Sequence, residues 1–208
     1  MDRRTLILRS ALGGLALTAS SASIASAQRM TDKILTEAGP LPERAFGSPN
    51  AKVTVVEYAS LTCHHCRDFH LKTWPAIKAK YVDTGKVRFI LREFPLDKVA
   101  LGGAMLARCA KDDNWYEVVD TLYRQDDQWA HAPSPLEGLR GLLTRSLMSN
   151  AQFEACLSDQ PLQEKITTIA RGGTIAGVTS TPTFFINGKK YQGFMTPEIF
   201  GQILDNLL

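Results

Sequence analysis

Apolar and polar positions follow two different periods along this chain. Three short apolar segments next to turn-forming residues have the pattern of buried strands: 53–58, 87–91 and 181–186. Between the second and the third, residues 97–170 place apolar side chains at helical spacing and show little strand signal. The pattern therefore predicts a sheet interrupted by a long helical block.

Turn residues and helix breakers mark the other expected boundaries. A helix of about four turns over 63–81 should follow the first strand, with Pro75 kinking or breaking it. Gly177 is placed to end the helical block. The Asn-Gly pair within 187–192 favours a tight hairpin, and a closing helix is expected over 197–208.

The N-terminus has a different character. Arg3 and Arg4 precede an apolar stretch over 11–19, and small residues lead to a cleavage-type site after Ala27, which is the pattern of an export signal. We expect cleavage after Ala27 and a periplasmic protein. An uncleaved anchor is the alternative, and the sequence does not separate the Sec from the Tat export route.

The elements run in the order strand, helix, strand, helical block, hairpin, helix, and a Cys-x-x-Cys sequence opens the first helix. This order is typical of an α/β, thioredoxin-like fold with an inserted all-helical subdomain. The lead-in after the signal is polar and is expected to be loosely held, with one short helix. The expected organisation is an export signal at 1–27, the lead-in at 28–46, a thioredoxin-like domain at 47–96 and 171–208, and a helical insertion at 97–170.

Composition and charge narrow the class of protein. The apolar fraction is 44% and the charged fraction 22%, which excludes wholesale disorder. The net charge is +3, and because three arginines and one aspartate lie within 1–27, the rest of the chain is almost neutral. A nucleic-acid binder would carry a basic stripe, and a protein held on an anionic membrane would carry a polybasic surface. Both classes are therefore disfavoured.

The four cysteines all follow the signal, in a compartment where disulfides persist, and an even number suggests two pairs. Cys63 and Cys66 have the spacing of a redox Cys-x-x-Cys motif. Cys109 and Cys156 lie in the helical block, and we expect them to form a structural disulfide. Such a bond would close a long loop and stabilise the fold by up to about 4 kcal/mol. A second redox pair is the alternative.

Cys63 is expected to be the reactive thiol because it stands at a helix N-terminus. The helix dipole, the free backbone N–H groups and the neighbouring His65 all favour its thiolate. Full ionisation at neutral pH gains roughly 30-fold in thiolate, whereas a pKa lowered by about four units loses roughly 60-fold in intrinsic nucleophilicity. A low pKa therefore makes Cys63 little better as an attacking group and much better as a leaving group. The motif is better suited to donating its disulfide than to reducing the disulfides of other proteins.

A zinc half-site is the alternative for this motif. His64, His65 and His70 could serve as additional ligands. However, Cys109 and Cys156 do not supply the second ligand pair that a structural zinc site usually needs. We therefore expect neither a metal site nor a cofactor.

Two further positions outside the motif, a peptide bond and a side chain, each allow two interpretations. The Thr181-Pro182 bond is either a cis peptide that exposes backbone for a substrate strand or an ordinary trans bond. Glu57 lies in a buried strand, where an isolated carboxylate is costly. It is either a proton acceptor for Cys66 or the partner of an arginine on the next strand, namely Arg88 or Arg92.

Four sequence segments together resemble the DsbA-like thiol:disulfide oxidoreductases. These segments are Val55-Val56-Glu57-Tyr58, Cys63-His64-His65-Cys66, Arg92-Glu93-Phe94-Pro95-Leu96 and Gly177-Val178-Thr179-Ser180-Thr181-Pro182-Thr183-Phe184. The resemblance runs from about residue 47 to 208, and the combination is specific where Cys-x-x-Cys alone is not. It implies a thioredoxin fold with a helical insertion.

The resemblance also implies roles for individual residues. Cys63 would be the nucleophile, Cys66 the resolving thiol, Pro182 a cis-proline and Glu57 the buried acid. His65 matches the histidine of the usual Cys-Pro-His-Cys motif. His64 departs from that motif, because it stands where the proline is usual, and this leaves the oxidising strength open. We expect His64, Thr181 and Pro182 to contact the substrate. Cys109 and Cys156 lie where some members carry a second, non-catalytic disulfide.

The function that follows is a periplasmic dithiol oxidase that introduces disulfide bonds into exported proteins. Its expected partners are reduced or unfolded exported proteins and a DsbB-type membrane reoxidant, and a monomer is expected because no segment is long enough for a dimerisation domain. The alternatives are a periplasmic reductase or isomerase and, in another class, a metal-binding or metallochaperone module.

Overall fold

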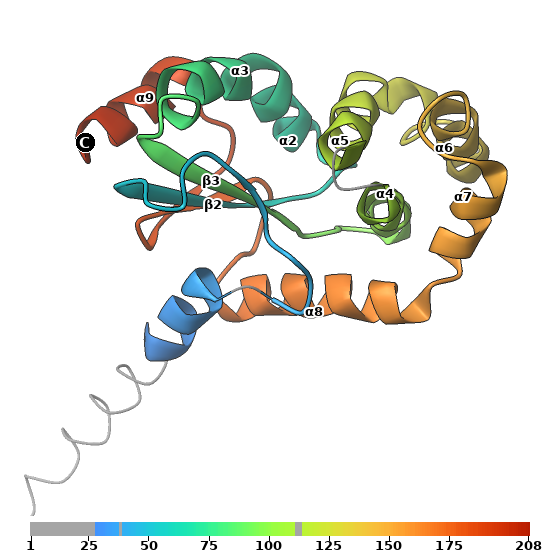
Figure 1. The fold of residues 1–208 in the computed structure, drawn as a ribbon, viewed down its shortest axis with the longest axis horizontal. Helices are drawn as coiled ribbons and strands as arrows, with labels where there is room; N and C mark the ends of the chain where they lie inside the picture. Colours follow the sequence, from blue (N-terminus) through green and yellow to red (C-terminus); the bar gives the residue numbers. More distant parts are fainter. Residues whose placement is uncertain (1–27, 38, 111–113) are drawn as a thin grey trace, which may run out of the picture.

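A computed structural model describes residues 28–37, 39–110 and 114–208, and the expected export signal lies outside them. At its centre is a five-stranded mixed sheet in the order β1-β3-β2-β4-β5 (Figure 1). Its strands are β1 (Arg44–Phe46), β2 (Val53–Ala59), β3 (Val87–Glu93), β4 (Thr183–Ile186) and β5 (Lys189–Gln192). β2 and β3 are parallel, and each of the other neighbouring pairs is antiparallel.

Helices cover both faces of the sheet and form a separate lobe beside it (Figure 1). α3 and α9 lie over one face, and the C-terminal half of α8 lies under the other. The described α-helices after residue 46 are α2 (His64–Asp68), α3 (Trp74–Ile77), α4 (Lys98–Cys109), α5 (Trp115–Arg124), α6 (Pro135–Leu143), α7 (Asn150–Leu157), α8 (Gln160–Ile175) and α9 (Pro197–Asp205). The α/β class with an inserted helical part is therefore confirmed.

The alternation of side chains along β2 and β3 supplies two hydrophobic cores, one on each face of the sheet. Val55 and Phe89 pack with Phe184 under α3 and α9. On the opposite face, Val56 and Ile90 belong to a cluster that also contains residues of α8. Strands buried on both faces explain the nearly continuous apolar runs in the sequence.

The lobe beside the sheet contains α4 to α7 and the first half of α8. Its core includes Leu106, Leu122, Trp129, Leu143 and Phe153, none of which is measurably exposed to solvent. The boundary expected at residue 170 falls inside α8, which is a single helix shared by the lobe and the sheet. The lobe is therefore joined to the sheet without a flexible linker at that end.

Pro75 does not break the helix that follows β2. α2 leads directly into a π-helical segment, Phe69–Thr73, and then into α3, where Pro75 occupies the first turn. The backbone N–H of Trp74 donates to the carbonyl of Phe69, five residues earlier. The wider π turn makes room for the proline ring and removes the need for its missing N–H. A second π-helical segment, Lys78–Val82, completes the helix.

Two turns form as the sequence predicts. Asn187 and Gly188 both have positive φ, at 46° and 81°, which suits the two-residue turn between β4 and β5. Gly177 follows α8 with a φ of 88°, a conformation that glycine adopts without strain.

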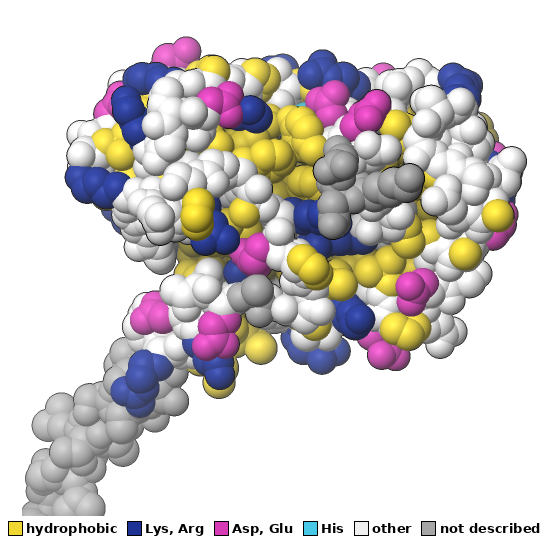
Figure 2. All heavy atoms as spheres, viewed as in Figure 1, with side chains coloured by type: hydrophobic (Ala, Val, Ile, Leu, Met, Phe, Trp, Pro, Cys, Tyr) yellow, Lys and Arg dark blue, Asp and Glu magenta, His cyan; other side chains and the backbone are white. Residues whose placement is uncertain are grey.

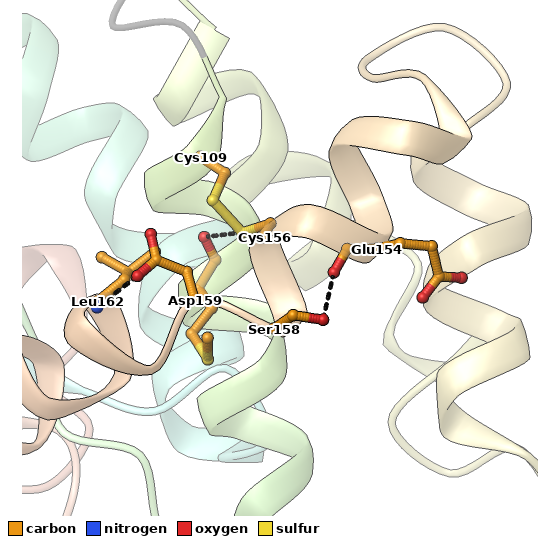
Figure 3. Close-up of a disulfide and its surroundings, with 7 residues drawn as sticks. Cys109, Glu154, Cys156, Ser158, Asp159 and Leu162 are labelled. Carbon is orange, nitrogen blue, oxygen red and sulfur yellow. Dashed lines mark hydrogen bonds between the residues drawn. A yellow bond between two sulfur atoms is a disulfide. The ribbon is translucent and has the colours of Figure 1, made fainter.

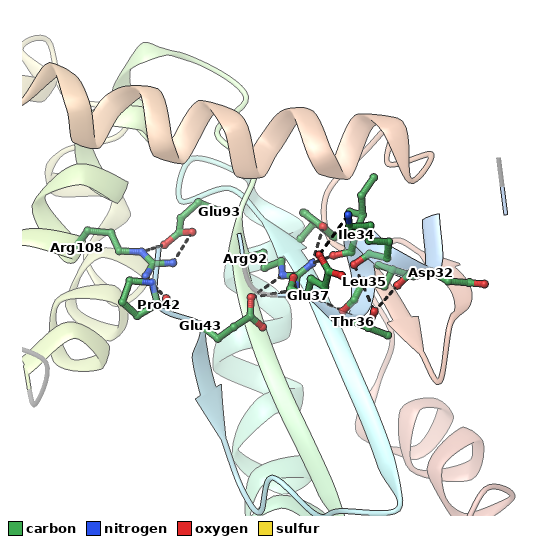
Figure 4. Close-up of polar contacts among 12 residues, drawn as sticks. Asp32, Ile34, Leu35, Thr36, Glu37, Pro42, Glu43, Arg92, Glu93 and Arg108 are labelled. Atoms are coloured by element: carbon green, nitrogen blue, oxygen red, sulfur yellow. Dashed lines mark hydrogen bonds and ion pairs between the residues drawn. The ribbon is translucent and has the colours of Figure 1, made fainter. Parts of the chain in front are cut away.

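The segment before β1 is not loosely held, and that expectation is wrong. A helix occupies 28–36, and its last carbonyls meet the guanidinium of Arg92, which is 4% exposed (Figure 4). Arg92 donates to the carbonyls of Ile34, Leu35 and Glu37, to the Tyr58 hydroxyl and to the carboxylate of Glu43. A buried arginine that satisfies a helix C-terminus fixes this segment to the sheet.

A second arginine fixes the same segment to the lobe. Arg108 of α4 makes a bidentate ion pair with Glu93 at the end of β3 and donates to the carbonyl of Pro42 (Figure 4). Both partners of this ion pair are largely buried. The segment before β1 thus lies across the junction between the sheet and the lobe.

The expected disulfide between Cys109 and Cys156 is present and joins the end of α4 to α7 (Figure 3). Nearby, Asp159 begins α8 by accepting the backbone N–H of Leu162. The bond therefore ties together helices of the lobe that are separated by 47 residues in sequence.

Acidic and basic side chains are interspersed over the face shown in Figure 2, and hydrophobic side chains gather along its middle, between the sheet and the lobe. Over the described ranges, no helix is both long enough and apolar enough to cross a bilayer.

Candidate active site

The candidate site lies where β2 ends and α2 begins. Cys63 is the residue before the first turn of α2, in an extended conformation with φ −86° and ψ 116°. Cys66 lies one turn later and is only 1% exposed, whereas Cys63 is half-buried. Both are free thiols in this structure. The chain therefore offers one accessible and one sealed sulfur on the same face of a helix.

The surroundings of Cys63 favour its thiolate and lower its pKa to about 5. The main cause is a hydrogen bond from the thiol of Cys66, which outweighs the opposing effect of burial. The side chain of Thr181 and the backbone N–H groups of Cys66 and His65 stabilise the negative charge further. This is the effect expected of a helix N-terminus on a thiol.

Cys66 has the opposite tendency. Its pKa is raised well above the ordinary value, mainly by burial, and then by its hydrogen bond to Cys63 and by the charges of Glu57 and Cys63. A buried sulfur surrounded by apolar groups resists ionisation because the thiolate loses its hydration. In the reduced pair, Cys63 is therefore the thiolate and Cys66 the thiol.

Glu57 lies on β2 and is 5% exposed. Burial, followed by the charge of Cys63, raises its pKa to about 8. Within the described part of the chain, it makes no ion pair with Arg88 or Arg92. The strand register gives the reason: Thr54 and Tyr58 stand beside these two arginines, so the arginines and Glu57 project from opposite faces of the sheet.

The loop before β4 closes the site from the other side. The Thr181-Pro182 peptide bond is cis, as the resemblance implies. This geometry brings the carbonyl of Thr181 to 3.3 Å from the sulfur of Cys63, which donates to it. The Thr181 hydroxyl is buried and makes no hydrogen bond within the described residues, which leaves it available to the Cys63 thiolate.

The three histidines near the motif do not lie together. His64 and His65 are exposed, with their ring centroids 4.0 Å apart. His70 is buried, and its Nε2 lies 3.0 Å from Oδ1 of Asp120 on α5. In the described ranges, no three His, Cys, Asp or Glu side chains are arranged to hold a metal ion. The geometry therefore does not favour the zinc alternative.

Sequence reasoning missed the residues that support the motif from the lobe. Tyr123 of α5 is 2% exposed and shares a hydrophobic cluster with Cys66, and its hydroxyl donates to the carbonyl of Ser60 over 3.4 Å. In the sequence, Tyr123 is only one of the apolar positions at helical spacing within 97–170. Nothing in the local sequence could have found it, because 63 residues separate Tyr123 from Ser60.

The turn before Cys63 has a further support. Thr62 donates its hydroxyl to Oδ2 of Asp97 over 2.7 Å, and Oδ1 of Asp97 accepts the backbone N–H of Ala100 to begin α4. An aspartate before a helix is a recognisable N-cap signal, but its second oxygen is free to bind any neighbour. Only the fold shows that this neighbour is the residue preceding Cys63.

These groups form a site for thiol–disulfide exchange. It contains a stabilised thiolate at Cys63, a sealed thiol at Cys66, a protonated acid at Glu57 and the Thr181 carbonyl of the cis bond beside the Cys63 sulfur. The low pKa of Cys63 makes its sulfur a good leaving group.

Comparisons with known proteins agree with this arrangement. A family model described as thioredoxin matches residues 41–206. A Rickettsia typhi protein, provisionally named a protein-disulfide oxidoreductase, is 33% identical over 161 residues, which are 76% of this chain and 59% of that protein. This chain therefore spans little more than half the length of that relative.

Solved structures show the same fold. The crystal structure of alpha-DsbA1 from Wolbachia pipientis superposes with a TM-score of 0.74 and 34% identity, covering 81% of this chain and 92% of that one. BdbD from Bacillus subtilis, in its oxidised form, superposes with a TM-score of 0.69 and 18% identity, covering 79% and 92% of the two chains. The second match speaks for the fold alone.

Proposed function

The chain belongs to the DsbA-like thiol:disulfide oxidoreductases of the thioredoxin superfamily, and from this premise we propose that it is an exported dithiol oxidase. In this role it introduces disulfide bonds into exported proteins. The disulfide between Cys63 and Cys66 is the oxidising equivalent, and no bound cofactor takes part. As part of this proposal, residues 1–27 are removed on export. The rest of the chain is divided into the lead-in, the thioredoxin-like domain and the helical insertion at the boundaries that the sequence pattern gives.

The observation that carries the proposal is the opposite tendency of the two thiols. The pKa of Cys63 is lowered to about 5, and that of Cys66 is raised well above its usual range. A stabilised Cys63 thiolate favours the reduced pair, so the corresponding disulfide is easily given up. An enzyme that reduces its substrates would need a less stable Cys63 thiolate, so that its own disulfide form is favoured.

The reaction begins when a substrate thiolate attacks the sulfur of Cys63 in the disulfide form. A bond forms between the substrate sulfur and Cys63, and the bond between Cys63 and Cys66 breaks. Cys66 leaves as a thiolate in an apolar site where that charge is costly. Glu57, which is largely protonated at neutral pH because its pKa is about 8, supplies the proton that makes Cys66 a thiol.

The second step releases the product. Another thiolate of the substrate attacks the substrate sulfur of the mixed disulfide, so the substrate disulfide forms and the bond to Cys63 breaks. Cys63 leaves as the stabilised thiolate. Two electrons have passed from two substrate thiols to the enzyme. When a partner reoxidises the enzyme, Cys66 must lose its proton again, and the Glu57 carboxylate accepts it.

Substrate binding is assigned to the loop that holds the cis bond. A cysteine peptide in extended form can add to the backbone edge near Thr181 and Pro182, which places its sulfur next to Cys63. His64 is exposed beside Cys63 and is the third expected contact. His65 contributes its backbone N–H to the thiolate.

Location and partners follow from the export signal and the family. The proposed compartment is the periplasm, the substrates are reduced exported proteins, and a DsbB-type membrane protein is the proposed reoxidant. The enzyme is proposed to act as a monomer.

Fractionation of cells that make the full chain, with mass determination of the mature N-terminus, tests the location. A soluble periplasmic protein that begins at Gln28 is expected, and retention at the membrane with an intact signal contradicts it.

The decisive experiment is the reduction potential of the Cys63–Cys66 pair in glutathione buffers. A value near the oxidising end of the family scale, roughly −120 mV, is expected. A value near that of thioredoxin, roughly −270 mV, contradicts the oxidase role and favours a reductase. A Cys63→Ser variant is the control, because it leaves no exchanging pair.

A further inference from the structure

The second thiol of the site, Cys66, lies in the hydrophobic cluster that forms the core of the lobe. Tyr116, Asp120 and Tyr123 are spaced four and three residues apart on α5, so they share one face of that helix. This face meets the helix that carries the motif. We refer to the contacts of these three residues with Trp74, His70 and Arg67 as the α5 seam.

Each residue of the α5 seam has a defined polar partner. His70 Nε2 lies 3.0 Å from Oδ1 of Asp120, and Asp120 in turn binds Arg124. Trp74 donates its indole N–H to the Tyr116 hydroxyl over 2.7 Å. These bonds lie at the border of the hydrophobic cores and hold α5 against the helix that begins at Cys63.

The remaining contact fixes the backbone next to Tyr123. Arg67 follows Cys66 directly, and its Nε donates to the carbonyl of Tyr123 over 3.1 Å while pairing with Asp126 at 2.9 Å. The ring of Tyr123 packs against that of His70 in a tilted arrangement, with centroids 4.7 Å apart. Tyr123 is thereby held at both its backbone and its ring.

The position of Tyr123 explains why Cys66 is so deeply buried. Cys66 and His70 are four residues apart and lie on one face of their helix, and Tyr123 packs in the same hydrophobic cluster as Cys66. Tyr123 and Cys66 are 2% and 1% exposed. We therefore expect removal of the Tyr123 ring to admit water to the sulfur of Cys66.

We propose that Tyr123 is a positioning residue that seals Cys66 and thereby sets the lifetime of the mixed disulfide at Cys63. This inference deepens the proposed function by naming the element that regulates it. When a substrate is bound through its sulfur to Cys63, two thiols compete to resolve the bond. One belongs to the substrate and the other is Cys66.

The competing reaction is balanced within the enzyme and its bound substrate. The thiolate of Cys66 attacks the sulfur of Cys63, the Cys63–Cys66 disulfide reforms, and the substrate leaves as a thiolate. No oxidation of the substrate results, so the cycle is wasted. The rate of this return is proportional to the fraction of Cys66 that is ionised. A sealed Cys66 is hardly ionised, and the substrate's own second thiol then has time to react.

The test uses a disulfide that releases a coloured thiol. The reduced protein is mixed with 5,5′-dithiobis(2-nitrobenzoate), and the release of the nitrothiobenzoate anion is followed at its absorption maximum. Cys63 releases the first anion at a rate proportional to reagent concentration and keeps the other half as a mixed disulfide. Attack by Cys66 then releases the second anion at a rate independent of reagent concentration. The second rate constant measures the return reaction directly.

Variants of the α5 seam should change that second rate constant alone. Tyr123→Ala is expected to raise it about 10-fold or more, since each lowering of the Cys66 pKa by one unit gives tenfold more thiolate. Asp120→Ala, a milder change at the border of the seam, is expected to raise it about threefold. Tyr123→Phe keeps the ring and Asp120→Asn keeps a hydrogen-bonding partner for His70, so both should stay within about twofold of the parent.

A matched control separates sealing from general loss of stability. Leu143→Ala removes a fully buried side chain from the same hydrophobic core but lies on α6, outside the α5 seam. It should lower the melting temperature and leave the second rate constant unchanged. The proposal is overturned if Tyr123→Ala and Asp120→Ala release the second anion no faster than the parent, or if Leu143→Ala accelerates it equally. A thioredoxin-like reduction potential would contradict the oxidase role and leave this comparison of rates intact.

Discussion

Burial separates the chemistry of three acidic groups in the candidate site, Glu57, Cys63 and Cys66. Glu57 and Cys66 are nearly inaccessible to water, and each holds its proton to a higher pH than in solution. Cys63 is half-buried at a helix N-terminus, and its pKa falls instead. The same hydrophobic surroundings therefore keep the proton on two groups, while hydrogen bonds remove it from the third.

The difference between the two thiols predicts selective alkylation. When the reduced protein reacts with iodoacetamide at pH 6, one carbamidomethyl group should be found, on Cys63, because its pKa of about 5 leaves it ionised. A peptide map identifies the modified residue, and the rate should fall by half near pH 5. Equal labelling of Cys66 would contradict the assignment.

Glu57 predicts a characteristic dependence of stability on pH. Burial raises its pKa from 4.5 to about 8 in the folded protein. Between these values the folded protein holds a proton that the unfolded chain has lost, so the free energy of unfolding should fall as pH rises through this window. Glu57→Gln removes this loss, which for a shift from 4.5 to about 8 is on the order of 5 kcal/mol at its largest.

The measurement is urea unfolding of the disulfide form at pH 4 and pH 8.5, which avoids the titration of Cys63. In this form burial alone raises the pKa of Glu57, because the Cys63 charge is absent, so the loss is smaller than its largest value. Glu57→Gln should gain stability relative to the parent at the higher pH. Glu164→Gln, an exposed position on α8, is the control for loss of one negative charge and should show no such gain. If both variants behave alike, Glu57 is not a buried acid in solution.

Turnover of Glu57→Gln should fall, because Cys66 loses its proton donor and acceptor.

At the scale of helices and strands, two buried arginines make their polar contacts at helix ends and at junctions between elements. Arg92 ends the helix over 28–36 by taking up carbonyls that the helix cannot satisfy itself. Arg108 binds Glu93 at the point where β3 leaves the sheet for α4. Both arginines stand where one element ends and the next begins, and each is nearly sealed from water.

Replacing Arg92 with alanine should therefore be costly. It leaves the Glu43 carboxylate and several carbonyls buried without a donor, and the expected loss is about 3 kcal/mol in the free energy of unfolding. Cleavage by trypsin after the exposed Lys33 should become faster because the segment is released. The control is Lys33→Ala, which breaks an exposed pair with Glu37 and should cost less than about 0.5 kcal/mol in urea unfolding. A comparable cost for both variants would show that Arg92 is not an anchor.

For the whole molecule, the arrangement makes the lobe part of the redox site. α5 shares a hydrophobic cluster with Cys66, and α4 begins at an aspartate that binds the residue before Cys63. The disulfide between Cys109 and Cys156 holds α4 and α7 together within the lobe. We expect it to support the lobe without taking part in the exchange reaction.

Removal of that disulfide should reduce stability and leave the chemistry unchanged. The double variant Cys109→Ala/Cys156→Ala is expected to lose about 2–4 kcal/mol in the free energy of unfolding, since the bond closes a loop with a sequence separation of 47. The pH at which Cys63 is half-alkylated should not move. A shift in that pH would indicate that the second disulfide is coupled to the redox pair.

The fold class and the motif could be predicted because their signals are local. A β-branched run is a strand in almost any context, and an Asn-Gly pair in 187–192 takes the positive φ values of a tight turn by itself. The position of Cys63 at a helix start likewise follows from neighbouring residues. β1 was missed because three residues carry no period, and only the edge of β3 makes them a strand.

The partners of buried polar groups could not be predicted, because register and packing choose them. One of the two sequence-based alternatives paired Glu57 with Arg88 or Arg92, but a parallel register puts the arginines and the glutamate on opposite faces of the sheet. It offered no reason to place Tyr123 beside Cys66. Local sequence determined which groups react, through helix starts and strand periods. The tertiary structure decided how strongly each holds its proton, because burial and long-range contacts set the cost of charge.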